Sequence, residues 1–110
     1  MKNKFVNAGK GILSGMHHKS ILVQMILGLC ALTAGALLQL TYLEWCAVII
    51  CIGCVIASEM LNTCIEKICD MYSLEYRPDI KIIKDIAAGA VLVTSLMSLV
   101  VAVILFVHHM

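Results

Sequence analysis

The sequence predicts an all-α membrane protein with three spanning helices and an N-terminal amphipathic helix on the membrane surface. Of its 110 residues, 62% are hydrophobic and only 14% are charged. Charged side chains are nearly absent from residues 20–43, 45–58 and 86–107. A helix needs about 20 mostly apolar residues to cross a bilayer. Composition and run length therefore exclude an ordinary soluble domain.

The surface helix is predicted in residues 1–18, at the start of a single domain that covers residues 1–110. Its apolar side chains recur at helical spacing, opposite a face of lysine and small polar side chains. Such a helix lies flat on an anionic leaflet. An unstructured basic tail is the alternative, and the regular spacing favours the helix.

Three spans are predicted at residues 20–41, 45–70 and 78–108. Lysine and histidine side chains precede the first span, and further cations lie between the second and third. The short connection at residues 41–45 has no lysine or arginine. The positive-inside rule therefore predicts a cytoplasmic N-terminus and an external C-terminus. No cleavable signal is expected, because the first apolar run is long and preceded by amphipathic residues.

Polar side chains follow one stripe of the second predicted span, which continues toward the cytoplasm. Their spacing of 0, 3, 4, 7 and 11 residues places them on one helix face; they are Glu59, Asn62, Thr63, Glu66 and Asp70. Helix rise predicts Glu59 at about 10 Å inside the cytoplasmic boundary and Glu66 at that boundary. Lys84 and Asp85 begin the third apolar run at a matching height.

These residue types fit a phosphoryl-transfer site. Carboxylates can hold Mg²⁺, which prefers oxygen ligands and shares its shell with nucleotide phosphates. A lysine suits a phosphate, and Glu59 suits a general base for a lipid hydroxyl. Two alternatives stay open from the residues alone. The polar groups could join helices of a homo-oligomer, or Glu59 could serve a small proton-coupled transporter.

Gln24 is the strongly polar residue of the first span. It can be an interhelical hydrogen-bond partner or, together with Glu59, part of a lipid-binding pocket. Six cysteines include the pair Cys51 and Cys54 at CxxC spacing. No second pair or ligand histidine accompanies them, so they are predicted to be free apolar side chains.

Two segments resemble the signatures of a known family. Residues 59–70, EMLNTCIEKICD, resemble the E-x-x-N-[ST]-x-x-E-x-x-x-D signature of bacterial integral-membrane diacylglycerol and undecaprenol kinases. Residues 84–92, KDIAAGAVL, resemble the second signature of that family. The resemblance covers essentially the whole chain. It implies a bacterial inner-membrane kinase that phosphorylates a membrane lipid alcohol with ATP and Mg²⁺, as a homotrimer with sites shared between protomers and with no nucleic-acid partner.

The resemblance also implies roles for the matching residues. Glu59 would be the catalytic base, and Asn62 would position the reacting groups. Glu66 would bind the metal that accompanies ATP. The remaining matched positions would contact the nucleotide and its phosphates; they are Asp70, Lys84 and Asp85.

The chain departs from the family pattern at Lys19, where the family commonly has a glutamate that helps to bind metal. His17 and His18 stand beside it. A second metal site is therefore not expected. Either one cluster around Glu66 suffices, or the protein is a weakened or inactive homologue. The acceptor is expected to be undecaprenol or diacylglycerol, and the two motifs look closer to the undecaprenol branch.

Overall fold

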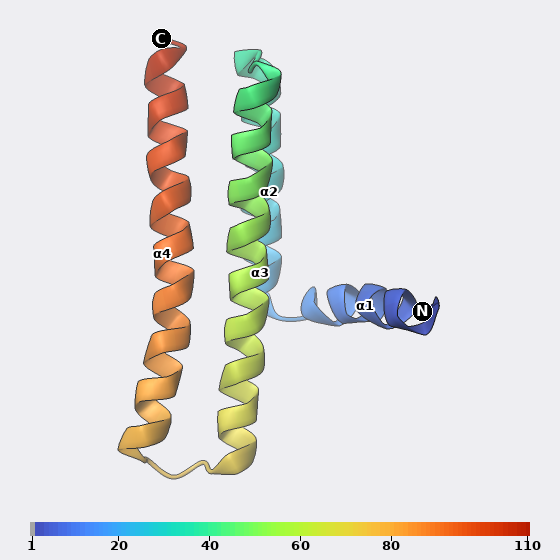
Figure 1. The fold of residues 1–110 in the computed structure, drawn as a ribbon, viewed down its shortest axis with the longest axis vertical. Coiled ribbons are helices and arrows are strands. Elements are labelled where there is room, and N and C mark those ends of the chain that lie inside the picture. The colour runs from blue at the N-terminus through green and yellow to red at the C-terminus, as the bar shows by residue number, and fades with distance from the viewer. Residues whose placement is uncertain (1) are drawn as a thin grey trace.

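The computed structural model describes residues 2–110, and this part of the chain forms four helices without a strand (Figure 1). Met1, the first residue of the predicted surface helix, lies outside the described residues. The helices are α1 (Lys2–Gly15), α2 (Lys19–Leu38), α3 (Tyr42–Tyr72) and α4 (Pro78–His108). Three of the described helices, α2, α3 and α4, are long and apolar enough to cross a membrane. The predicted all-α membrane fold is confirmed.

The three long helices run side by side, and α1 extends crosswise from them (Figure 1). The central helix is α3, because it packs against both α2 and α4 and its contact with α4 is the more extensive. The molecule measures 51 × 37 × 22 Å along its principal axes. A flat bundle of this shape leaves most of its apolar side chains exposed, which suits a lipid environment or contact with further copies.

The turn between α2 and α3 is fixed by local hydrogen bonds. Gln39 has a positive φ of 56°, and this left-handed residue ends α2 at Leu38. The Thr41 hydroxyl accepts a hydrogen bond from the Glu44 amide at 3.3 Å, and the Glu44 carboxylate accepts one from the Thr41 amide at 3.0 Å. This capping box satisfies free amides at the start of α3.

The same turn is linked to the C-terminal end of α4. His109 Nε2 lies 2.8 Å from Glu44 Oε2, in a contact between two partly buried side chains. The first turn of α3 is therefore held against the residue that follows α4, which closes this end of the bundle.

Two glycines allow α2 to approach α3 closely. A Cβ atom at Gly28 would lie 2.9 Å from Cγ2 of Ile52, and one at Gly35 would lie 2.9 Å from Cη2 of Trp45. Small residues permit this kind of close packing in membranes. The Trp45 ring thus packs on the backbone of α2 at Gly35.

At the opposite end, α3 and α4 extend beyond the corner between α1 and α2 (Figure 1). Both α3 and α4 have 31 residues, whereas α2 has 20. Gly15 is buried in the corner, where an added Cβ atom would lie 3.7 Å from Cε of Met60. We call residues 61–91, which lie beyond Met60, the helical arm.

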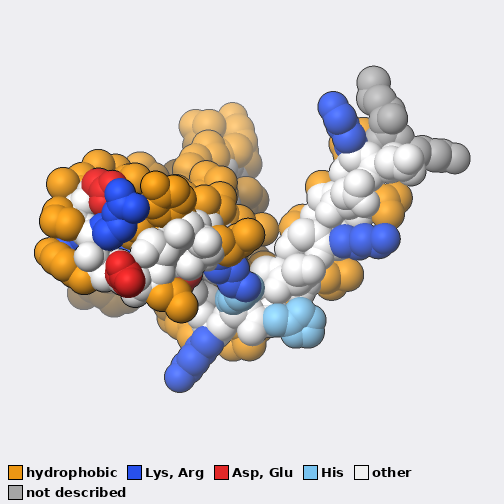
Figure 2. All heavy atoms as spheres, turned by 90° about the horizontal axis from the view of Figure 1, so that it is seen from below, with side chains coloured by type: hydrophobic (Ala, Val, Ile, Leu, Met, Phe, Trp, Pro, Cys, Tyr) orange, Lys and Arg blue, Asp and Glu red, His pale blue; other side chains and the backbone are white. Residues whose placement is uncertain are grey.

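The end of the helical arm is polar. Figure 2 shows acidic and basic side chains gathered there among apolar ones. Arg77 contacts Asp79 at 3.1 Å and lies over the Tyr72 ring at 5.0 Å from the ring centroid. Pro78 occupies the first turn of α4, where its missing amide hydrogen leaves no helical bond unmade. The connection between α3 and α4 is therefore compact.

Candidate active site

Two polar side chains are buried at the base of the helical arm. Glu59 and Asn62 lie on α3, and each retains only 8% of its exposure. Among the described residues, these are the two that are both buried and polar. Burial of a carboxylate and an amide is unfavourable unless they have partners, so both are candidates for a functional role.

The amide of Asn62 is satisfied on one side only. Its Nδ2 donates a hydrogen bond to Glu66 Oε1 at 3.0 Å, one helical turn away. Its Oδ1 is buried and has no hydrogen-bond partner within the described chain. Because most buried polar atoms in proteins are paired, this oxygen is a candidate contact for a ligand or a neighbouring subunit.

The oxygen atoms of this site have the chemistry that Mg²⁺ prefers. Asn62 Oδ1 and the carboxylate oxygens of Glu66 are hard donors, like the phosphate oxygens with which Mg²⁺ usually shares its shell. Within residues 2–110 the structure contains no group of three histidine, cysteine, aspartate or glutamate side chains arranged for a metal. Asn62 and Glu66 would thus supply only part of a magnesium shell, and the other ligands would have to come from a nucleotide, water or another copy of the chain.

Lys84 and Asp70 are brought together from two helices. Lys84 Nζ lies 2.7 Å from Asp70 Oδ1, with 36% and 50% of the two side chains exposed. Exposed ion pairs contribute little to stability. Lys84 can therefore leave Asp70 for a phosphate at small cost, which suits its predicted place in a nucleotide site.

Asp85 is paired with a lysine of its own helix. Its Oδ2 lies 2.6 Å from Nζ of Lys81 on the same helix. In the described part of the chain, no hydrogen bond joins Asp85 to the pair of Lys84 and Asp70. The spacing of four residues could have indicated the contact with Lys81 from the sequence.

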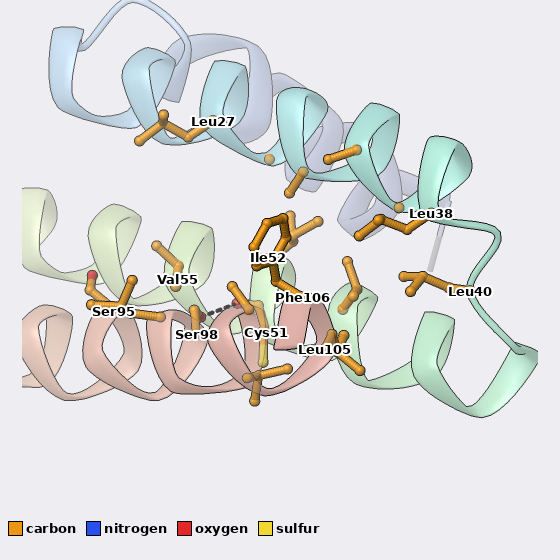
Figure 3. A pocket seen from close by; sticks show the side chains of 18 of the residues that line it. Leu27, Leu38, Leu40, Cys51, Ile52, Val55, Ser95, Ser98, Leu105 and Phe106 are labelled. Atoms are coloured by element: carbon orange, nitrogen blue, oxygen red, sulfur yellow. Dashed lines mark hydrogen bonds between the residues drawn. The ribbon is translucent and has the colours of Figure 1, made fainter. Parts of the chain in front are cut away.

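Gln24 of α2 faces an apolar cavity. It lines a cavity of about 640 Å³ between α2, α3 and α4 (Figure 3). The side chains labelled in the figure are mainly apolar, and Ser95 and Ser98 of α4 are among them. Glu59 is not among the described residues that line this cavity. Of the two predicted lipid-binding residues, Gln24 therefore lines this cavity and Glu59 does not.

A smaller cavity does reach the buried amide. It has a volume of about 340 Å³ and lies between α3 and α4. Its walls are mostly apolar, and Ser58 and Asn62 supply its polar lining from α3. Its existence depends on the packing of two helices, which sequence spacing does not reveal.

Lys19, the residue that departs from the family pattern, begins α2 and is exposed. None of the hydrogen bonds or ion pairs found among the described side chains involves it. The preceding His18 adopts extended backbone geometry at the N-cap, without a side-chain capping bond. The corner between α1 and α2 thus carries a free cation near the level of Met60.

Comparison with known proteins identifies the family of the chain. The family model for prokaryotic diacylglycerol kinase matches residues 6–106. The undecaprenol kinase of Bacillus subtilis (strain 168) is 34% identical over 103 residues, covering 93% of this chain and 84% of that protein.

The fold and the site define a small helical membrane enzyme, with polar groups gathered where its helices leave the apolar bundle. The chain belongs to the prokaryotic diacylglycerol kinase family. It is therefore a bacterial membrane protein and a lipid kinase, as its two motifs predict.

Proposed function

We propose that the protein transfers the γ-phosphoryl group of ATP to the hydroxyl of undecaprenol at the cytoplasmic face of the inner membrane. The observation that carries this proposal is the burial of Glu59 and Asn62 at the base of the helical arm. The Asn62 Oδ1 atom has no hydrogen-bond partner among the described residues. The choice of acceptor is supported by the undecaprenol kinase relative and by the two motifs.

Glu59 has the position of a general base. It is one residue from Met60, which packs at the corner where α1 meets α2. We take α1 to lie at headgroup depth. Its corner with α2 then brings Glu59 to the level of a lipid hydroxyl, nearer the surface than the depth of about 10 Å expected from helix rise. The carboxylate accepts the hydroxyl proton as the lipid oxygen bonds to the γ-phosphorus. The bond from that phosphorus to the β,γ-bridging oxygen breaks, and ADP leaves.

The nucleotide occupies the helical arm in this proposal. Lys84 exchanges Asp70 for a phosphate oxygen, because its exposed ion pair is weak. Asn62 and Glu66 would hold a magnesium ion together with the phosphates, through the oxygen donors described above. When bound, Mg²⁺ neutralises charge on the β- and γ-phosphates. Asp70 and Asp85 lie farther along the arm, toward the nucleoside.

The same geometry supports an orientation in the membrane. ATP is available in the cytoplasm, and the helical arm carries the cations Arg77, Lys81 and Lys84. By the positive-inside rule, these side chains favour a cytoplasmic arm. The N-terminus lies on that side as well, and the turn capped by Thr41 lies outside.

We also propose that the active form is a homotrimer with shared sites. A single copy leaves Asn62 Oδ1 unpaired and presents too few oxygen ligands for a complete metal site. A neighbouring copy can supply the groups that residues 2–110 of one copy lack, and can cover exposed apolar helix faces. Small residues and interhelical hydrogen bonds are typical of such contacts in membranes.

The deciding experiment measures phosphate transfer from labelled ATP, with Mg²⁺, by purified protein in mixed micelles. Undecaprenol and diacylglycerol are offered in parallel, and Glu59→Gln serves as the blank. Transfer to undecaprenol by the wild type, lost in Glu59→Gln, is the expected result. Transfer only to diacylglycerol would overturn the acceptor, and transfer to neither lipid by an assembled oligomer would overturn the proposed activity.

A further inference from the structure

A hydrogen bond between two hydroxyls joins α3 to α4 inside the apolar part of the bundle. Ser58 Oγ lies 2.9 Å from Thr94 Oγ1, and both side chains are partly buried. Ser58 directly precedes Glu59, so the bond is made one residue from the proposed base. Within an apolar medium little water competes for such a bond.

The protons of the two hydroxyls can be fully accounted for. Ser58 Oγ also lies 2.9 Å from the Val55 carbonyl oxygen, and Thr94 Oγ1 lies 3.0 Å from that of Val91. Each hydroxyl has one proton to donate. One hydroxyl therefore donates across the interface, and the other donates to its own helix. Either direction leaves both hydroxyls satisfied.

A third hydroxyl extends the contact toward the opposite end of the bundle. Ser98 Oγ donates to the Thr94 carbonyl oxygen at 2.9 Å and lies 3.5 Å from the Cys51 carbonyl oxygen, the contact drawn in Figure 3. Residues 51, 55, 58 and 62 lie on one side of α3, where Cys51, Val55 and Asn62 are buried. The hydroxyls therefore lie along a continuous seam between α3 and α4.

Two links between α3 and α4 bracket the candidate active site. The hydroxyl pair lies at one end, and the ion pair of Asp70 with Lys84 lies at the other. Residues 59–69 of α3, which include Glu59, Asn62 and Glu66, lie between them. The ion pair opens when Lys84 takes a phosphate. The hydroxyl pair then remains to hold the two helices in register.

We propose that Ser58 and Thr94 are positioning residues, which fix Glu59 of α3 relative to Lys84 of α4 through their hydrogen bond. Neither hydroxyl touches the substrate in this role. The bond sets the rotation and axial position of the helices, so its loss misplaces the reacting groups without removing one. The inference rests on the proposed function of the site.

The test uses Thr94→Val, which removes the hydroxyl and keeps the branched shape. We expect kcat for phosphate transfer to fall about threefold to tenfold, the range that interhelical hydrogen bonds in membranes support. The KM for ATP should stay unchanged, because the nucleotide ligands are intact. Thr94→Ser retains the hydroxyl and should restore kcat. In a double-mutant cycle, adding Ser58→Ala to Thr94→Val should cause little further loss.

Thr33→Val is the matched control. The Thr33 hydroxyl bonds only to the Leu29 carbonyl of its own helix, at 3.0 Å, and the side chain is exposed. The proposal is overturned if Thr94→Val is no slower than Thr33→Val. It is also overturned if Thr94→Ser is as slow as Thr94→Val, or if the Ser58 and Thr94 losses multiply independently.

A second readout separates this inference from the proposed activity. Amide hydrogen exchange in residues 62–70 needs no turnover and should be faster in Thr94→Val than in Thr33→Val. Equal exchange in the two variants would overturn the role of the hydroxyl pair, even if the wild type is an active kinase. If the wild type shows no turnover but exchange is faster in Thr94→Val, the proposed reaction is overturned. The conclusion that the hydroxyl pair links α3 to α4 would still stand.

Discussion

Lys84 of α4 holds Asp70 of α3 across the helical arm, with 2.7 Å between Nζ and Oδ1. The two residues come from different sequence motifs and are 14 positions apart. Their contact joins the second motif to the first, so the antiparallel packing of α3 and α4 assembles one site from two segments.

Replacing Lys84 by methionine should raise the KM for ATP and lower kcat/KM by at least about tenfold. The variant keeps an unbranched side chain and loses the charge that pairs with phosphate. Steady-state phosphate transfer over a range of ATP concentrations measures the effect. Lys67→Met is the control, because Lys67 is an exposed cation of the same arm. Equal losses in both variants would contradict a specific role for Lys84.

Glu66→Gln should raise the Mg²⁺ concentration needed for half-maximal turnover by about tenfold. The glutamine can still accept the hydrogen bond from Asn62 Nδ2, which is 3.0 Å from Glu66 Oε1 in the wild type. The variant thus loses mainly the negative charge that favours a hard cation. Magnesium titration of phosphate transfer provides the measurement, with Glu75→Gln in the connecting loop as the control. An unchanged Mg²⁺ requirement would remove Glu66 from the metal site.

Lys19→Glu should increase turnover and reduce the Mg²⁺ requirement if the natural lysine weakens the enzyme. Lys19 is exposed and begins α2 at the corner that packs near Met60. A carboxylate there would restore the residue type that the family commonly has at this position. Lys19→Gln separates removal of the cation from addition of a ligand. No gain in Lys19→Glu would mean that the cluster around Glu66 suffices.

Gly35→Ala should destabilise the protein by about 1–3 kcal/mol, the usual effect of forcing an extra carbon into a packed contact. The added Cβ atom would lie 2.9 Å from Cη2 of Trp45 and 3.0 Å from Cδ1 of Leu40. Gly53→Ala meets no atom within 4 Å and should be neutral or stabilising by about 0.5–1 kcal/mol. Reversible unfolding in micelles measures both. Similar stability changes in the two variants would contradict the close approach of α2 and α3.

Mixing Glu59→Gln with Lys84→Met should not restore turnover, because the proposed site takes both residues from α3 and α4 of one chain. Mixed oligomers, prepared by unfolding and refolding the variants together, should keep the low turnover of the separate variants. Wild-type-like turnover in verified mixed oligomers would instead place Glu59 and Lys84 of different chains in one site, and would contradict positioning through Ser58 and Thr94.

The sequence alone predicted the architecture well, because apolar run length and helical spacing report directly on membrane helices. The surface helix and three long helices follow from these signals. The exact ends of the helices depend on local geometry. Gln39 ends α2 by adopting a left-handed conformation, which is unusual for a residue other than glycine and has no sequence signal of its own.

The polar stripe of α3 was also visible in the sequence, because helical periodicity places Glu59, Asn62 and Glu66 on one face. The residues that contact one another between α3 and α4 could not be seen in the sequence. The contact of Ser58 with Thr94 joins residues 36 positions apart, and common hydroxyl side chains in an apolar run have many possible partners. The role of each site residue is a prediction, which the kinetic measurements above test.

Because α2 is shorter than α3 and α4, the fit of the protein to a bilayer depends on the thickness of that bilayer. A helix of 20 residues is about 30 Å long, so α2 has little spare length with which to follow a thicker hydrocarbon layer. Hydrophobic mismatch is then relieved by thinning of the lipid around the protein or by drawing Lys19 and the base of the arm inward. Acyl-chain length should therefore change how deep Lys19 and the base of the arm lie below the headgroups.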